Sequence, residues 1–238
     1  MPRWKGEKYY ALWENARIIT ADVPLDREAA KKILPLGMRL SGTPRATLFI
    51  ADYTKTVFTI PYREAALLIH VATPFGRGVH CPWMLVDDDT ALIYGRELLG
   101  YPKKMGSFAF HEGDGKITAT VARHGINLIS MEITLGEKEA DPSPMFDVKT
   151  FNAGGLGQFF YFNPIRMFRA REVIHESHSG KITLHVFHSA NDPIAELIAG
   201  DPVNGRYVIM DIIGGRYMLP VGIAGPLWLK KVFSLRFE

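Results

Sequence analysis

The chain has 238 residues, of which 47% are hydrophobic and 22% are charged, with a formal net charge of +3. This composition excludes an intrinsically disordered chain, and so small a charge argues against a nucleic-acid-binding protein. Cys81 is the only cysteine, so neither an intrachain disulfide nor a cysteine metal cluster can form. The sequence shows no 18-residue apolar run for a membrane span and no apolar signal-peptide core at its start. We therefore expect a cytoplasmic protein that binds neither membrane nor nucleic acid.

Alternation of apolar and polar residues with a period of two predicts a mainly β protein. The segments with this pattern are residues 46–51, 56–60, 64–72, 107–111, 116–122, 127–135, 181–187 and 206–213. Turn signals separate the segments, among them Ser179-Gly180 and Gly214-Gly215. Residues 137–166 are rich in Pro, Gly and Asn, and we expect a long irregular connection there. Since no domain boundary is visible, we interpret residues 1–238 as one mainly antiparallel β domain with a few short helices.

Three short helices are predicted, at residues 27–34, 90–99 and 193–198. Asp26 and Asp192 precede the first and third helices, where a carboxylate can accept hydrogen bonds from free backbone N–H groups. The second helix follows three consecutive aspartates, which suit the positive end of the helix dipole. Gly100 fits its C-terminal end, and Pro102 prevents its continuation.

The most informative segment follows the second helix and reads Gly100-Tyr101-Pro102-Lys103-Lys104. Lysine is normally solvated, and apolar residues flank this pair on both sides. Desolvation of an ammonium lowers its pKa, and the neutral amine that results is a nucleophile toward carbonyl groups. The alternative is two ordinary surface lysines on a strand or turn.

Residues 95–106, Gly-Arg-Glu-Leu-Leu-Gly-Tyr-Pro-Lys-Lys-Met-Gly, resemble the active-site segment of the acetoacetate decarboxylase family. The resemblance extends more weakly to residues 62–64 and 83–89. It implies that Lys103 forms a Schiff base with the substrate and that Lys104 is its cationic neighbour; this family is itself a standard example of an activated lysine. The resemblance also implies a closed, cone-like β-barrel around the lysine, and a homo-oligomer.

The two lysines have different expected roles. On an extended strand they point to opposite faces. Two ammonium groups roughly 8 Å apart repel by about 2 kcal/mol, or roughly 1.5 pKa units, at an effective dielectric constant of 20. Burial shifts a lysine pKa by about 3–5 units. We therefore expect desolvation of Lys103 to dominate, with assistance from Lys104. The protonated imine supplies the electron sink, so the chemistry requires no metal or organic cofactor.

Glu64 is the best candidate partner of Lys103. Tyr62, Glu64, Ala66 and Leu68 share one face of a predicted strand, so a carboxyl group lies on a largely apolar face, where its pKa should rise into the range of a general acid. By resemblance, Glu64 occupies the family's Tyr-x-Glu position beside the lysine. The alternative is a glutamate that reaches solvent or pairs with Arg63.

The sequence departs from the family where the resemblance implies an N-terminal arginine in the pocket and a second glutamate. The best register places Ala16 at the first position, one step from Arg17, and the second falls near Ala46. We take Tyr101, Met84 and Arg17 as candidate substrate-binding residues. The first hypothesis for the function is decarboxylation of a small β-keto acid, acetoacetate to acetone and CO2. The alternatives are a Schiff-base aldolase or dehydratase of 2-keto acids, and a non-catalytic barrel that binds a small ligand.

Overall fold

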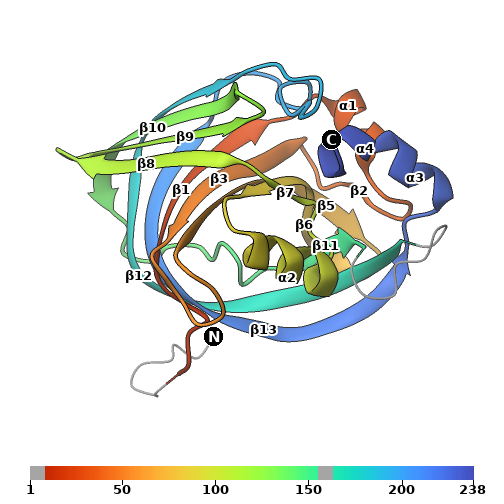
Figure 1. Cartoon of the computed structure of the whole chain (residues 1–238), viewed down its shortest axis with the longest axis horizontal. Helices are drawn as coiled ribbons and strands as arrows, with labels where there is room; N and C mark the ends of the chain where they lie inside the picture. Colours follow the sequence, from red (N-terminus) through yellow and green to blue (C-terminus); the bar gives the residue numbers. More distant parts are fainter. Residues whose placement is uncertain (1–8, 155–162) are drawn as a thin grey trace.

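The computed structural model describes residues 9–154 and 163–238, and its main feature is a closed ring of β-strands (Figure 1). Within these residues the order around the ring is β11-β6-β5-β3-β1-β13-β12, and pairing of β12 with β11 closes it. The bounds are β1 (Trp13–Pro24), β3 (Arg45–Tyr53), β5 (Tyr62–Thr73), β6 (Gly76–Val86), β11 (Thr150–Ala153), β12 (Pro164–Val186) and β13 (Asn204–Ile223). All neighbours in the ring are antiparallel except β11 and β6. The predicted β-barrel is confirmed.

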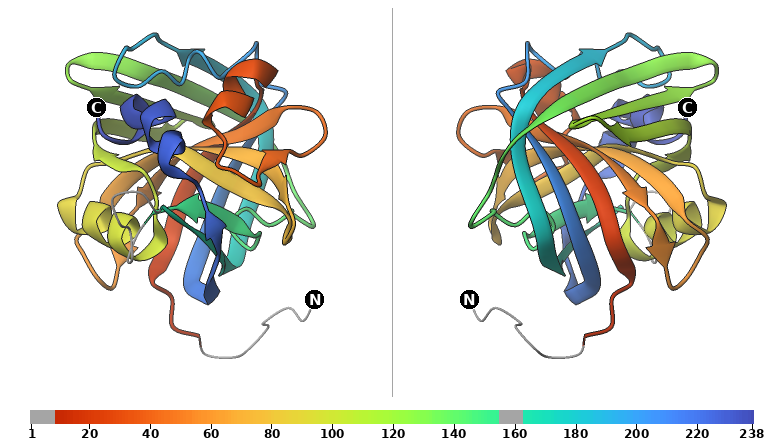
Figure 2. Two further views of the ribbon diagram at one scale, coloured as in Figure 1. Left: turned by 90° about the vertical axis from the view of Figure 1, so that its right-hand side faces the viewer. Right: turned by 90° about the vertical axis from the view of Figure 1, so that its left-hand side faces the viewer.

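Further strands extend the wall beyond β12. They are β10 (Ile126–Lys138), β9 (Lys116–Arg123) and β8 (Ser107–Gly113). Three short strands pair with strands of the ring: β2 (Arg39–Leu40) with β5, β4 (Lys55–Thr56) with β1, and β7 (Lys103–Met105) with β6. Both views in Figure 2 show β8–β10 in the upper part of the molecule, the part that also holds the C-terminus. The strip β8–β10 and the C-terminal helices therefore lie at the same end of the barrel.

Four short helices accompany the strands of the described chain. They are α1 (Arg27–Ile33), α2 (Asp89–Leu99), α3 (Pro226–Lys231) and α4 (Phe233–Arg236). The first two confirm the prediction. The Asp26 side chain accepts a 2.7 Å bond from the backbone N–H of Ala29, and Asp88 does the same for Ala91. The predicted helix at residues 193–198 is wrong, because that segment forms turns. None of the described helices is long and apolar enough to cross a membrane.

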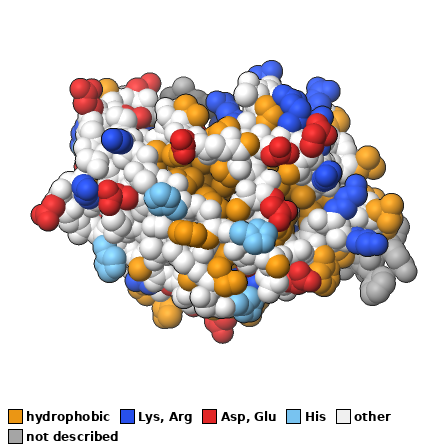
Figure 3. All heavy atoms as spheres, turned by 90° about the horizontal axis from the view of Figure 1, so that it is seen from above, with side chains coloured by type: hydrophobic (Ala, Val, Ile, Leu, Met, Phe, Trp, Pro, Cys, Tyr) orange, Lys and Arg blue, Asp and Glu red, His pale blue; other side chains and the backbone are white. Residues whose placement is uncertain are grey.

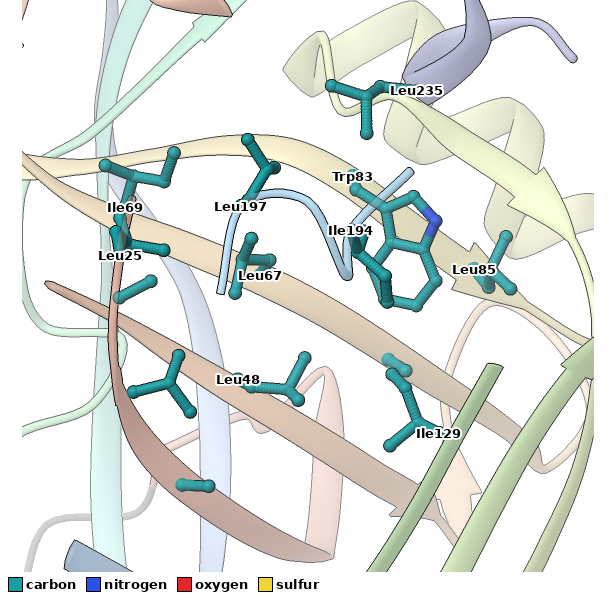
Figure 4. Close-up of a cluster of buried hydrophobic side chains, with 14 of the residues drawn as sticks. Leu25, Leu48, Leu67, Ile69, Trp83, Leu85, Ile129, Ile194, Leu197 and Leu235 are labelled. Carbon is teal, nitrogen blue, oxygen red and sulfur yellow. The ribbon is translucent and has the colours of Figure 1, made fainter. Parts of the chain in front are cut away.

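Strands of the barrel wall are buried on both faces. One face packs against α1, α3, α4 and the 190–199 turns; we call its buried residues the helix-side cluster, and Figure 4 shows Trp83, Ile194, Leu197 and Leu235 within it. The other face carries the lysine-side cluster, which includes Ala16, Phe49, Ala51, Tyr53, Tyr62, Ala66, Cys81, Met84, Val86 and Met210. Because neighbouring side chains alternate between the faces, β1, β3, β5 and β6 each contribute residues to both clusters.

Several predicted turns and strands take a different form. Of residues 56–60, only Thr56 lies in a strand, and its hydroxyl donates to the carbonyl of Thr59 to form a turn. Gly180 lies inside β12 and not in a turn. A glycine is needed there because a Cβ would collide with the carbonyl of Thr134 on the neighbouring strand. Gly214-Gly215 likewise lies within β13. The predicted irregular connection contains β11 and the first residues of β12, and its residues 155–162 lie outside the described chain.

Apolar side chains also reach the surface. On α2, Ile93 is 56% exposed and Tyr94 is 49% exposed. Figure 3 shows the surface of the molecule from above. Hydrophobic side chains are visible across the middle of this face, and most of its lysines and arginines lie toward the right-hand end. Apolar surface of this kind is a feature of protein contact sites.

His80 on β6 makes the stability depend on pH. Its ring is buried, and its Nδ1 lies 2.8 Å from the carbonyl oxygen of Phe151. Burial lowers the pKa of His80 from its ordinary 6.5 to about 4. As the pH falls below 6.5, the unfolded chain therefore takes up a proton that the folded chain does not, and stability is lost between about pH 7 and pH 4.

We expect His80 to account for a loss of about 2 kcal/mol in unfolding free energy between pH 7 and pH 5. Urea unfolding of wild type and His80→Gln at both pH values measures this contribution, because the other titrating groups are common to both proteins. Equal pH dependence in the two proteins would contradict it.

Candidate active site

The end of α2 sets the direction of the lysine segment. Gly100 ends the helix with a φ of 71°, in the left-handed region that favours glycine, and the Tyr101 N–H donates to the carbonyl of Gly95. After Pro102 the chain forms β7, which pairs in parallel with β6 so that Lys103 lies opposite Met84. The strand is extended, so consecutive side chains point to opposite faces.

Lys103 and Glu64 meet on the lysine-side face. The Lys103 Nζ lies 2.6 Å from Glu64 Oε2, and both side chains are less than 10% exposed. The Tyr53 hydroxyl donates a longer bond of 3.4 Å to the other carboxyl oxygen. Arg63, the alternative partner of Glu64, instead forms ion pairs with Asp87 and Asp52. The structure thus brings together the two side chains that the sequence pairs.

Buried phenol groups surround this pair. The Lys103 Nζ lies 5.7 Å from the centre of the Tyr62 ring, and the Tyr53 and Tyr62 rings contact each other with centroids 4.8 Å apart. Burial, together with the Glu64 carboxylate, raises the pKa of Tyr53, Tyr62 and Tyr101 well above the ordinary value of a phenol. These three side chains therefore remain protonated and can act as hydrogen-bond donors at neutral pH.

The candidate substrate-binding residues Tyr101 and Met84 both pack on the lysine-side face. Met84 is a buried member of the cluster. Tyr101 contacts Phe168 edge-on, with ring centroids 5.6 Å apart. Both side chains therefore share a face with Lys103.

Arg17 points away from this face. Its neighbour Ala16 packs in the lysine-side cluster, whereas the Arg17 guanidinium forms ion pairs with Asp52 and, at 3.6 Å, with Glu112. The structure does not bring Arg17 to Lys103, and we correct its expected place among the substrate-binding residues. The physical reason is the alternation of side chains along β1, which separates residues 16 and 17.

Lys104 points to the opposite side of β7 from Lys103. Its Nζ lies 2.5 Å from Asp192 Oδ1 and donates to the backbone carbonyls of Asn191 and Ser234 at 2.9 and 2.7 Å. Burial lowers the pKa of Lys104, and the Asp192 carboxylate opposes this shift. A carboxylate thus neutralises this ammonium on the far face, which limits its repulsion of Lys103.

Asp192 binds side chains from three distant parts of the chain on the helix-side face. Besides Lys104, it accepts a 2.7 Å bond from the Trp83 indole and pairs with Arg123 at 3.1 Å. Its side chain is only 1% exposed. The sequence suggested a helix cap at Asp192, whereas the carboxylate is instead the shared acceptor of a buried network.

Gly95 is a further site residue that the sequence analysis missed. Gly95 lies on the face of α2 that contacts Lys103, and a Cβ at this position would collide with the Cδ and Cε atoms of the lysine. The adjacent Arg96 donates a 2.9 Å bond to the Lys103 carbonyl. A glycine inside a predicted helix is the signal that could have identified this close approach.

The described part of the chain contains no cluster of three or more His, Cys, Asp or Glu side chains that could hold a metal ion. The chemically distinctive group on the lysine-side face is the buried amine–carboxyl pair. Buried charges in proteins are normally paired, so the pair alone is also compatible with a structural role.

Comparison with known proteins gives the family. The model of the acetoacetate decarboxylase (ADC) family matches residues 1–219, so the chain belongs to this family. An acetoacetate decarboxylase from Clostridium botulinum (strain Eklund 17B / Type B) is 24% identical over 198 residues, with 79% of each chain covered. A CLA biosynthesis isomerase from Lactiplantibacillus plantarum is 25% identical over 214 residues, which cover 78% of this chain and 74% of the relative.

Solved structures share the fold at lower identity. An acetoacetate decarboxylase structure superimposes with a TM-score of 0.81 at 19% identity and covers 91% of both chains. The acetoacetate decarboxylase from Legionella pneumophila subsp. pneumophila str. Philadelphia 1 gives a TM-score of 0.77 at 17% identity, with 94% and 92% covered. The enduracididine biosynthesis enzyme MppR, complexed with pyruvate, gives 0.72 at 13% identity, with 93% of each chain covered.

Proposed function

We propose that this protein is an enzyme that forms a Schiff base between Lys103 and a small keto acid and then breaks a carbon–carbon bond, with decarboxylation of a β-keto acid as the first candidate. The observation that carries the proposal is the buried pair of Lys103 Nζ and Glu64 Oε2, 2.6 Å apart. A lysine in this setting combines a nucleophile with an adjacent proton carrier.

The proposed reaction starts from the neutral amine of Lys103. Attack on the substrate ketone gives a carbinolamine, and loss of water gives a protonated imine. In a β-keto acid, the bond to the carboxylate then breaks, CO2 leaves, and the electron pair moves toward the imine nitrogen to give an enamine. Protonation at carbon and hydrolysis release the ketone and regenerate the amine. Glu64, within hydrogen-bond distance of the nitrogen, accepts and returns the protons.

A second candidate keeps the Schiff base and omits CO2 loss. The Arg17 guanidinium is directed toward Asp52 and Glu112, and the apolar Ala16 packs on the lysine-side face. An enamine from a 2-keto acid could then add to an aldehyde or support dehydration. The structure of MppR, which has the same fold, contains pyruvate, so pyruvate is the 2-keto acid with which we would test this candidate. Release of CO2 from acetoacetate, measured against addition of pyruvate to an aldehyde, separates the two candidates.

Borohydride trapping tests the shared Schiff-base step. Reduction in the presence of pyruvate or acetoacetate is expected to attach a substrate fragment to Lys103 alone, detected by peptide mass spectrometry. Lys103→Met should abolish this labelling, because no other amine lies beside Glu64 in the described residues. Lys104→Met is the matched control and should retain it. Labelling that survives Lys103→Met, or that appears on Lys104, would contradict the proposal and favour a non-catalytic barrel.

We also propose that the protein forms a homo-oligomer in the cytoplasm. Exposed apolar side chains on α2, including Ile93 and Tyr94, support a contact between copies. The buried Cys81 thiol is compatible with a reducing compartment. Light scattering tests the assembly, for which a monomer at micromolar concentration is the contrary result.

A further inference from the structure

Helix α4 contacts the lysine segment although it lies beyond residue 219, where the family match ends. Leu235 of α4 packs in the helix-side cluster beside Trp83 (Figure 4), which fixes the helix against the barrel wall. From this position, α4 approaches the backbone of residues 100–104, the chain that leads from α2 to Lys103.

Two direct hydrogen bonds and a bridge through Arg96 join α4 to this segment. The Arg236 Nη1 donates to the Gly100 carbonyl at 3.3 Å. The Arg96 Nη1 donates both to the Lys103 carbonyl at 2.9 Å and to the Arg236 carbonyl at 3.3 Å. The Lys104 Nζ donates to the Ser234 carbonyl at 2.7 Å. Both ends of the segment are therefore tied to one short helix.

Burial of the charged Arg236 side chain at this position costs desolvation free energy. Its side chain is buried, and no carboxylate of the described chain lies within ion-pair distance of it. Its Nε has no hydrogen-bond partner among the described residues. Burial and the nearby Arg96 lower the pKa of Arg236 to about 10. An apolar side chain would fill the same space without desolvating a charge.

The partners of Arg236 explain why a guanidinium is present. It lies at the C-terminal end of α2, where unpaired carbonyls carry partial negative charge, and its own bond goes to the carbonyl of Gly100. Gly100 packs closely against Gly154, because a Cβ added to Gly100 would lie only 2.9 Å from the Gly154 carbonyl oxygen. This close packing restricts the movement of Gly100. The guanidinium therefore acts on the residue where the chain turns from α2 toward Lys103.

We propose that Arg236 is a positioning residue, which holds the Gly100 carbonyl so that β7 presents the Lys103 amine to Glu64 and the substrate carbonyl. The inference rests on the proposed function for its catalytic consequence. The consequence is kinetic, because a misplaced nucleophile reacts more slowly even when the substrate still binds.

The test compares Arg236→Met with Arg236→Lys and the surface control Lys231→Gln. With pyruvate and borohydride as the probe, Arg236→Met is expected to label Lys103 on the order of tenfold more slowly at saturating pyruvate. The half-saturating pyruvate concentration should change by less than about twofold, because Arg236 acts on the lysine segment and not on the substrate. Arg236→Lys keeps a donor and should restore part of the rate, while Lys231→Gln should match wild type.

Amide hydrogen exchange of a peptide covering residues 100–105 provides a readout independent of the chemistry. Exchange should be faster in Arg236→Met and unchanged in Lys231→Gln. If wild type is not labelled at all, the Schiff-base proposal fails, while exchange still decides whether Arg236 holds the segment. The positioning role would be overturned if Arg236→Met labelled Lys103 and exchanged its amides at the wild-type rates. It would also be overturned if Arg236→Lys and Arg236→Met slowed the labelling of Lys103 equally.

Discussion

Glu64→Gln is expected to slow exchange of the pyruvate methyl protons with D2O by about 10²- to 10⁴-fold, the range for loss of a general acid–base group. The methyl group exchanges through the enamine, so the rate reports proton transfer. Glutamine retains the size of the side chain and a hydrogen bond to Lys103, but it cannot carry the proton. Borohydride labelling of Lys103 should persist, because amine attack does not require proton transfer at carbon. NMR of the methyl signal measures the first effect and mass spectrometry the second.

Tyr53→Phe is the matched control for Glu64→Gln. It removes only the 3.4 Å bond to the same carboxyl group, so its effect on exchange should be much smaller. If Glu64→Gln abolished labelling and exchange together, the carboxyl would be needed for imine formation itself. If neither changed, Glu64 would have only a structural part beside Lys103.

Asp192→Asn is expected to lower the free energy of unfolding by about 3–5 kcal/mol at neutral pH. The substitution preserves the shape of the side chain but removes the negative charge between Lys104 and Arg123. Two cations would then lie in the helix-side network without a carboxylate. Urea unfolding measures the change.

A double-mutant cycle with Lys104→Met isolates the lysine's share of this effect. Once Lys104 is absent, Asp192→Asn leaves one cation unpaired and not two, so its destabilisation should be smaller by more than about 1 kcal/mol. Additive effects of the two substitutions would show that the 2.5 Å contact contributes no coupling energy.

The central part of the site could be predicted from the sequence because its determinants are local. Alternation along residues 62–68 places Glu64 on one face, and the helix end at Gly100 followed by Pro102 makes the lysine strand extended. The resemblance to the family then supplies the pairing of Lys103 with Glu64. The partners of Lys104 could not be predicted, since Asp192 and Ser234 are distant in sequence and only the fold brings them together.

Two errors in the predicted fold come from strands that are buried on both faces or that lie close to a neighbouring strand, and a third comes from a helix that does not form. β1 escaped notice because Ile18, Ile19 and Ala21 are all buried, so the strand has no polar face to produce alternation. Gly180 resembled a turn signal, although it is needed where β12 approaches β10. The segment 193–198 has a capping aspartate, but that carboxylate binds Trp83, Lys104 and Arg123, and the expected helix does not form.

The contact between Gly95 and Lys103 has a consequence for the entropy of the reaction. A free lysine side chain samples many rotamers, and fixing it requires about 1.5–2 kcal/mol of conformational entropy. Here α2 packs at Gly95 against the aliphatic part of the Lys103 side chain, while Glu64 forms a hydrogen bond with the Lys103 Nζ. The loss of rotamer freedom therefore occurs when the chain folds, and an arriving carbonyl group meets an amine that is already confined to one direction.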